Sequence, residues 1–341
     1  MKESEVNMAM ELGKDLLYLS QGDIIGMNIG MPEMIDLMEK VYAEKGKGLT
    51  QMPPKPAVHS LPDKYPGDFI HAMPAFIPGM DAIGIKWVSG YENARDLGFP
   101  YISGLYILND TQTGIPIAVM DCVWMTTYRT AAVTGLTAKL LANPDSESIG
   151  LLGTGLQGRV QVDAILMVMD NIKEVKVFDK IPAAAEAYVK EMSAKHPDVK
   201  FTIVEDRVDA VKDCDLLSSC IPCSVVPGIE FITPDMIKPG CTALPVDDLV
   251  LYEPGTEDCF DKAYTDDRGQ FQHFKDMGFF RAFQELPAEL GEVIVGKAEG
   301  RTSHDEKILT VNIGTGLADV GTARMLYDRA IAEGIGTKLA L

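Results

Sequence analysis

Three glycines spaced as G-x-G-x-x-G could hold phosphate groups. Gly153, Gly155 and Gly158 follow a short apolar run, residues 149–152, and precede a predicted helix over 160–169. Glycines permit a tight turn and a close approach of the backbone to a pyrophosphate, which then lies on the free N–H groups at the helix N-terminus. An α/β turn without a ligand is the alternative for a glycine motif on its own.

An acidic residue follows at the position that a dinucleotide site requires. A second apolar strand, residues 175–178, ends in Asp179 and is followed by Lys180. An acid there accepts hydrogen bonds from the adenosine ribose and repels a 2′-phosphate. Strand, turn, helix, strand and acid thus occur in order within one βαβ-sized unit, which predicts dinucleotide binding and favours NAD over NADP.

Two cations occupy positions where a charge is unexpected. Lys86 lies in an otherwise apolar predicted strand, 83–88, where burial is costly unless the lysine is paired or functional. Arg129 lies among threonines on a small-residue helix and could bind a carboxylate through two parallel hydrogen bonds. A solvent-facing lysine and an ordinary surface arginine are the alternatives.

Two adjacent acids, Asp247 and Asp248, close a later predicted strand. Ligands of parallel sheets bind at the carboxyl ends of the strands. One acid of such a pair is expected to face solvent, and the other is a candidate general acid/base. No H-x-x-x-H or H-E-x-x-H spacing occurs among the five histidines, so no metal site is predicted.

The elements around these residues predict two domains of different architecture. Antiparallel strands are expected over 69–120, whereas strands and helices alternate after residue 148, as in a parallel, doubly wound sheet. A charged helix is expected over 261–283. The closing helix over 320–332 is expected to return to the first domain.

Composition restricts the partners of the protein. The chain has 341 residues and a formal net charge of −19, which argues against nucleic acid and anionic membranes. No apolar run approaches transmembrane length, and the polar N-terminus does not resemble a signal peptide, so a cytoplasmic location is expected. The six cysteines fit reduced thiols, and Cys220 and Cys223 are interpreted as part of a packed turn rather than a redox pair.

Several motifs occur in a fixed order along the chain, namely Met73-Pro-Ala, Gly84-Ile-Lys86, Gly98-Phe-Pro100, Asn109-Asp-x-x-Thr-Gly114, Met120-Asp121, Arg129-Thr130-Ala-Ala and the glycine motif. In this order they resemble the ornithine cyclodeaminase/mu-crystallin family, which includes archaeal-type alanine dehydrogenase and ketimine reductases. The resemblance covers nearly the whole chain. It implies a homodimer with a substrate-binding and dimerisation domain at 1–126, completed by 317–341, and a Rossmann-type NAD-binding domain at 127–316.

The resemblance also implies roles for individual residues. Lys86 and Arg129 would bind a substrate carboxylate near Met73, and the strand-end aspartate would be the acid/base. Because the segment departs from the family's glycine-alanine-aspartate pattern, Asp248 is the first choice and Asp247 the second. Lys55 stands where many members have an arginine, which keeps a cation but loses the bidentate fork and puts ornithine in doubt as substrate.

A further set of residues is expected to contact the cofactor. These are Arg129, Thr130, Gly153, Gly155, Leu156, Gln157, Gly158, Asp179, Lys180, Ser219, Cys220, Ile221, Val246, Asn312 and Gly314. Ser219 to Ile221 resembles a segment that lines the nucleotide, and 312–314 resembles the loop near the nicotinamide.

The function implied is an NAD-dependent oxidoreductase acting at the α-carbon of a small amino or imino acid. A cyclodeaminase-type ammonia lyase that uses NAD catalytically is the first alternative, because the same site can oxidise a diamino acid and return the hydride. A non-catalytic, nucleotide-dependent binder of a small molecule is the second. The sequence does not decide the substrate side chain or the stereochemistry.

Overall fold

The computed structural model describes residues 8–60, 67–222 and 231–341, which form two compact units. The first unit runs as far as Arg129 and is completed by Thr315–Leu341, and the second unit is Thr130–Gly314. The division expected from the sequence lay after residues 126 and 316. Cys223, of the cysteine pair considered above, lies outside the described residues.

The described part of the first unit contains a seven-stranded sheet with the order β15-β1-β6-β5-β4-β3-β2. The strands are β1 (Asp15–Leu19), β2 (Ala57–Val58), β3 (Phe69–Ile77), β4 (Ala82–Gly90), β5 (Ile102–Asn109), β6 (Pro116–Asp121) and β15 (Thr337–Ala340). Neighbouring strands from β3 to β6 are antiparallel, as the sequence predicted. Side chains in β4 alternate between buried and more exposed positions, so one face of the sheet belongs to the core.

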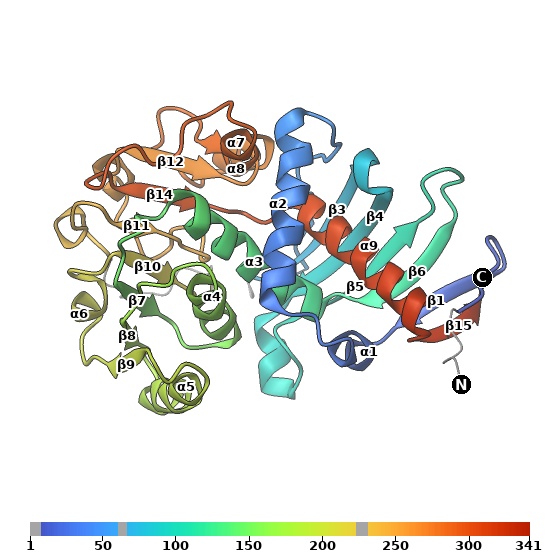
Figure 1. Cartoon of the computed structure of the whole chain (residues 1–341), viewed down its shortest axis with the longest axis horizontal. Helices are drawn as coiled ribbons and strands as arrows, with labels where there is room; N and C mark the ends of the chain where they lie inside the picture. The colour runs from blue at the N-terminus through green and yellow to red at the C-terminus, as the bar shows by residue number, and fades with distance from the viewer. Residues whose placement is uncertain (1–7, 61–66, 223–230) are drawn as a thin grey trace. The chain divides into compact units, whose positions relative to one another are not determined.

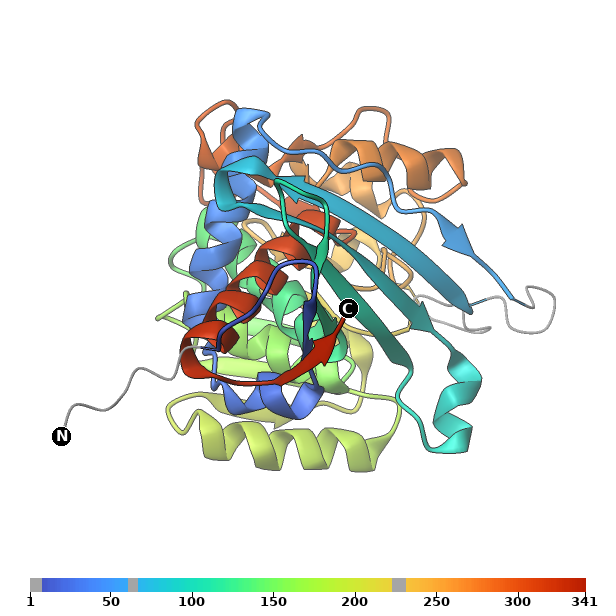
Figure 2. The same ribbon diagram turned by 90° about the vertical axis from the view of Figure 1, so that its right-hand side faces the viewer.

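Helix α9 (Gly316–Glu333) packs against β3 and β4 and against α2 (Met31–Lys47). Figure 2 shows α9, in red, running across the sheet. The Thr315 hydroxyl accepts a hydrogen bond from Ala318 N and so caps the helix, which ends at Gly334 in a left-handed conformation. The unit also contains α1 (Gln21–Gly26), and α3 (Val123–Leu141) begins in it.

The described residues of the second unit form an eight-stranded sheet with the order β13-β12-β14-β11-β10-β7-β8-β9, in which all the paired strands are parallel (Figure 1). The strands are β7 (Ser148–Leu152), β8 (Glu174–Phe178), β9 (Lys200–Ile203), β10 (Leu216–Ser219), β11 (Thr242–Ala243), β12 (Lys262–Thr265), β13 (Ala288–Glu289) and β14 (Ile308–Val311). The helices are α4 (Leu156–Leu166), α5 (Pro182–Lys195), α6 (Arg207–Val211), α7 (Arg268–Asp276) and α8 (Leu290–Ile294). Two core clusters, one around Tyr188 and one around Phe271, fill this unit. The doubly wound parallel fold predicted from the sequence is confirmed.

One predicted element was wrong. The segment 261–283, expected to be a single helix, contains β12 and the shorter helix α7. Lys262–Thr265 forms a strand instead, because its backbone pairs in parallel with β14 on one side and β13 on the other. The Asp267 carboxylate caps α7, and Gly278, with φ of 99°, follows the end of the helix.

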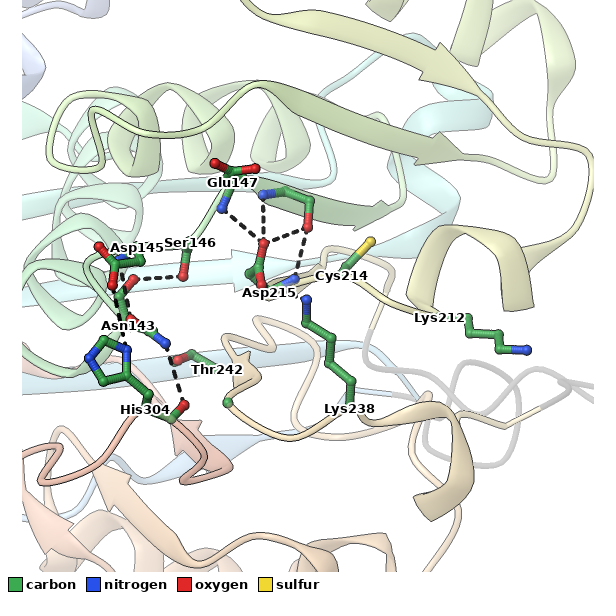
Figure 3. A network of polar contacts seen from close by, with 12 residues as sticks. Asn143, Asp145, Ser146, Glu147, Lys212, Cys214, Asp215, Lys238, Thr242 and His304 are labelled. Atoms are coloured by element: carbon green, nitrogen blue, oxygen red, sulfur yellow. Dashed lines mark hydrogen bonds and ion pairs between the residues drawn. The ribbon is translucent and has the colours of Figure 1, made fainter.

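A polar network fixes the amino-terminal ends of the parallel strands (Figure 3). Asp215 Oδ2 accepts hydrogen bonds from Glu147 N, Ser148 N and Ser148 Oγ at 2.9, 2.9 and 2.7 Å. Asp215 Oδ1 lies 2.6 Å from Lys238 Nζ. Burial raises the pKa of Asp215, but the contacts with Lys238 and Ser148 outweigh burial and lower it overall.

In the part of the chain that the structure describes, no helix is both long enough and apolar enough to cross a membrane.

Candidate functional site

The first unit buries two cations around one carboxylate. The alternation of β4 directs Lys86 into the core, where its exposure is 0%. Its ammonium nitrogen lies 2.7 Å from Asp319 Oδ2 and 3.4 Å from Thr126 Oγ1. The solvent-facing alternative for Lys86 therefore does not hold.

Arg129, on helix α3, contacts the same carboxylate. Its Nε lies 3.0 Å from Asp319 Oδ1, and its side chain is buried. Asp319 comes from the first turn of α9 and has an exposure of 0%. The analysis of the sequence missed Asp319. The available signal was an acid at 319 among the small and apolar residues 316–323, a pattern like the one that singled out Lys86.

Burial changes the acidity of Lys86. Desolvation lowers its pKa to about 8, the carboxylate of Asp319 opposes this shift, and the positive charge of Arg129 reinforces it. Lys86 is thus still mostly protonated at neutral pH. A buried ammonium beside a guanidinium can bind an anion.

Two other residues predicted to contact the substrate lie close to this cluster. Met73 of β3 is the register partner of Lys86 in β4 and is also buried. Lys55 precedes β2 and is half-buried. His71, two residues before Met73, has its pKa lowered to about 3 by burial and by the charges of Lys55 and Lys86, so its imidazole is neutral. It stacks on Phe69 with 4.3 Å between ring centroids.

The glycine-rich turn in the second unit has the form that a pyrophosphate requires. Gly153 has φ of 95°, and a Cβ on Gly158 would lie 2.3 Å from Gly153 O, so both positions need glycine. Among the described residues, no atom would lie within 4 Å of a Cβ on Gly155, and no side chain caps the N-terminus of α4. The first amides of α4 can therefore receive phosphate oxygens.

The residues that surround the glycine turn are partly or fully exposed. Leu156 is 59% exposed and Gln157 is half-buried, both in the first turn of α4. Asp179 Oδ2 accepts hydrogen bonds from Thr154 N at 2.8 Å and Thr154 Oγ1 at 2.7 Å, while Lys180 is exposed. The strand-end acid therefore lies directly beside the glycine turn, where it can also reach a ribose. These features fit a bound dinucleotide.

Two further segments, Ser219 to Ile221 and the residues around Val246, lie at the carboxyl edge of the same sheet. Ser219 ends β10 and is followed by Cys220 and Ile221; Cys220 N donates to Leu152 O, and Val246 N donates to Ser219 O. A Cβ on Gly153 would lie 2.8 Å from Cys220 O, so the turn and this segment are adjacent. Burial raises the pKa of Cys220 to about 12, which keeps it a thiol.

The loop after β14 is held by an acid that the analysis of the sequence also missed. Asp266, completely buried at the end of β12, accepts hydrogen bonds from Ile313 N at 3.0 Å and Gly314 N at 2.7 Å. Asn312 Nδ2 donates to Thr137 Oγ1 at 3.1 Å. Thr130, also expected to contact the cofactor, is a half-buried residue of α3.

The two adjacent acids differ sharply in environment. Asp247 has an exposure of 0%, and neither of its carboxylate oxygens has a hydrogen-bond partner among the described residues. Burial raises its pKa to about 8, the carboxylate of Asp248 acts in the same direction, and the nearby Ser219 hydroxyl, although not hydrogen-bonded to it, opposes the shift. Asp248 is half-buried. Asp248 and Leu249 both have positive φ, 52° and 64°, a backbone conformation that is uncommon for residues other than glycine.

Solved structures share this fold over nearly the whole chain. Delta(1)-pyrroline-2-carboxylate reductase of Thermococcus litoralis, in complex with NADH and L-proline, has a TM-score of 0.81 at 27% identity and covers 94% of this chain and 99% of its own. An archaeal alanine dehydrogenase dimer with bound NAD has a TM-score of 0.79 at 28% identity, covering 95% and 99%. These structures confirm the Rossmann-type fold and support NAD as the cofactor.

Sequence comparison gives the same result. N-((2S)-2-amino-2-carboxyethyl)-L-glutamate dehydrogenase of Staphylococcus aureus is 30% identical over 342 residues, which cover 97% of this chain and all of that protein. Residues 18–334 match the profile of the ornithine cyclodeaminase/mu-crystallin family. The resemblance seen in the sequence motifs is therefore confirmed, and the chain belongs to the ornithine cyclodeaminase/mu-crystallin family.

Proposed function

We propose that this protein is an NAD-dependent oxidoreductase that acts at the α-carbon of a small amino or imino acid. The observation that carries the proposal is the buried pair Lys86 and Arg129, whose two positive charges share the single carboxylate of Asp319. One positive charge is left over, which suits the carboxylate of an amino acid. When bound, NAD(H) accepts or supplies the hydride.

Lys86 and Arg129 bind the substrate carboxylate in this proposal and so orient the α-carbon. Met73 packs beside them, as its register with Lys86 allows. Lys55 adds a cation at the edge of the sheet but lacks the planar fork of an arginine. This difference argues for a substrate other than ornithine.

Asp247 is the better candidate for the general acid/base, although the sequence pattern favoured Asp248. With a pKa of about 8, Asp247 holds a proton at neutral pH and can exchange it near the operating pH. No residue in the described part of the chain hydrogen-bonds to its carboxyl oxygens, which supports a role in which they meet an amine or a water molecule. The half-buried Asp248 shapes the environment of its neighbour.

In this proposal, the residues predicted to contact NAD hold its pyrophosphate and ribose in place. The amides at the start of α4 receive the pyrophosphate, and Asp179 accepts from the adenosine ribose. Asp266 fixes the Asn312 to Gly314 loop through two backbone amides. We place the remaining predicted contacts, from Ser219 to Ile221, Val246 and Thr130, around the nucleotide.

A homodimer is also part of the proposal. The outer face of the first unit's sheet carries apolar side chains at positions that alternate with the buried ones, namely Ile83, Ile85, Trp87, Leu105 and Ile107. Trp87 is 50% exposed, and Leu105 and Ile107 are exposed as well. A contiguous apolar face of this kind is typical of an interface, and the similar alanine dehydrogenase is a dimer.

The test is a screen of the purified protein for turnover. Amino acids are offered with NAD, and keto acids with amines, or cyclic imines, are offered with NADH, while absorbance at 340 nm and ammonia are both followed. Accumulation of NADH supports the dehydrogenase, and ammonia release at constant NADH supports the cyclodeaminase. Tight binding of a small molecule without any turnover would contradict both and favour the binder. Lys86→Ala should lose at least about 100-fold in kcat/KM, whereas the exposed Lys47→Ala should not.

A further inference from the structure

Asp319 is held rigidly where it meets the two cations. It belongs to the first turn of α9, whose start lies against β3: a Cβ on Gly316 would be 3.1 Å from Met73 O. A Cβ on Gly321 would be 2.5 Å from Val41 Cγ2, so the next turn is equally close to α2. The first two turns of α9 therefore pack closely against β3 and α2, which leaves little room for the helix to move toward either. This close packing holds the backbone that carries Asp319.

The two oxygens of Asp319 serve different partners. Oδ2 lies 2.7 Å from Lys86 Nζ and Oδ1 lies 3.0 Å from Arg129 Nε. The partners come from separate elements, β4 and α3, and all three side chains are buried. Asp319 is thus the common contact that sets the spacing of the ammonium and the guanidinium.

Other titratable groups around Lys86 are neutral near pH 7. Burial raises the pKa of Tyr106, on β5, well above its usual value and raises that of Cys122, just before α3, to about 11. His71, on β3, is neutral because its pKa is about 3. Lys55 is a further cation outside the buried group. Lys86, Arg129 and Asp319 together therefore carry one net positive charge.

We propose that Asp319 is a positioning residue, which holds Lys86 and Arg129 side by side, keeps the Lys86 ammonium charged, and leaves one uncompensated positive charge for a single carboxylate. The part that concerns the substrate carboxylate rests on the proposed function. The part that concerns Lys86 does not, because it describes the free protein. An ion pair that only stabilises the fold would leave the chemistry of the site unchanged when the protein remains folded.

The protonation of Lys86 is measured first, without any substrate. Protein labelled with [ε-13C]lysine is titrated by NMR, and Lys86→Met assigns the signal. The wild-type midpoint is expected at about 8. Asp319→Asn should lower it by about one pH unit or more, because the opposing anion is lost while burial and Arg129 remain. Asp319→Glu should restore it, and Asp328→Asn, an exposed acid on the same helix, should leave it unchanged.

An unchanged Lys86 midpoint in a folded Asp319→Asn variant would overturn the proposal. If that variant does not fold, Asp319→Glu decides, because it keeps the charge and alters the spacing. In Asp319→Glu, the titration midpoint of Lys86 must stay near the wild-type value, while KM for L-alanine or L-proline with NAD rises about tenfold or more. A Glu variant equal to wild type in KM would refute the positioning role. If wild type turns over neither amino acid, the proposed function is in question, and the titration alone decides the effect of Asp319 on Lys86.

Discussion

The carboxylate of Asp179 accepts two hydrogen bonds from Thr154, one from its backbone amide and one from its hydroxyl. Thr154 lies between the first two glycines of the turn, so the acid at the end of β8 fixes the turn at the end of β7. In the proposed function, Asp179 therefore links recognition of the ribose to the shape of the phosphate site. A substitution at Asp179 should affect both.

Asp179→Asn should raise KM for NAD by roughly tenfold or more, since a charge-assisted hydrogen bond contributes about 1.5–3 kcal/mol. KM for NADP should rise less or should fall, because the negative charge that repels a 2′-phosphate is gone. Steady-state kinetics with both cofactors measures the ratio. Asp206→Asn, which changes an exposed helix cap in the same unit, serves as the control. An unaltered NAD-to-NADP ratio would argue against contact between Asp179 and the ribose.

Asp247→Asn should reduce kcat by about 100- to 10,000-fold, the range for loss of a general acid/base. Asp248→Asn should reduce it much less, because its side chain is only half-buried. The wild-type pH profile of kcat/KM should show two ionisations near 8, one from Asp247 and one from Lys86, and the Asp247→Asn variant should keep only that of Lys86. A larger loss of kcat in Asp248→Asn than in Asp247→Asn would instead assign the general acid/base role to Asp248.

Asp247 should also make stability depend on pH. Its pKa is raised from 3.8 to about 8, so the folded protein keeps a proton that the unfolded chain releases between about pH 4 and 8. The stability that this proton contributes is complete below pH 4 and is lost as pH rises through 8. Asn cannot ionise, so the Tm of Asp247→Asn minus that of wild type should grow from pH 5 to pH 8 by at least about 2 °C and then level off. Calorimetry at constant ionic strength measures the difference, and a flat difference would contradict the raised pKa.

Asp215→Asn should destabilise the second unit without acting on the ligand edge. The variant weakens hydrogen bonds from residues 147 and 148 and the ion pair with Lys238, and a loss of about 1–3 kcal/mol is expected. Because the pKa of Asp215 is lowered in the folded state, its contribution is present above about pH 4 and disappears as pH falls further. Urea unfolding at pH 7 and pH 3 measures the change. Equal destabilisation at both pH values would be evidence against a role for the charge.

Trp87→Asp should produce a monomer if the outer face of the sheet is the dimer interface. A buried, unpaired charge is strongly unfavourable, so association should weaken by at least about 100-fold. Light scattering coupled to size-exclusion chromatography measures the mass at micromolar concentration. Ile25→Asp, on α1 and outside this face, is the control, and an intact dimer in Trp87→Asp would move the interface elsewhere.

The sequence predicted well what depends on short stretches of chain. The glycine turn, its strands and Asp179 lie within one βαβ unit, and their types follow from local periodicity and glycine spacing. Residues 261–283 were misjudged because charged residues masked a four-residue strand whose identity depends on pairing with β14. Strand pairing of that kind is a tertiary property.

The residues of the candidate site also divide into those that the sequence revealed and those that only the tertiary structure revealed. The unusual charge of Lys86 in an apolar strand was visible from the sequence, because the cost of burying an ammonium is a property of the residue and its neighbours. Asp319, which contacts both Lys86 and Arg129, was not visible, because it lies 190 positions beyond Arg129 and meets the two cations only when α9 packs on the sheet. Likewise, residue types alone cannot decide which of two adjacent acids has its side chain buried. Burial depends on the whole fold, and burial gives Asp247 its proton at neutral pH.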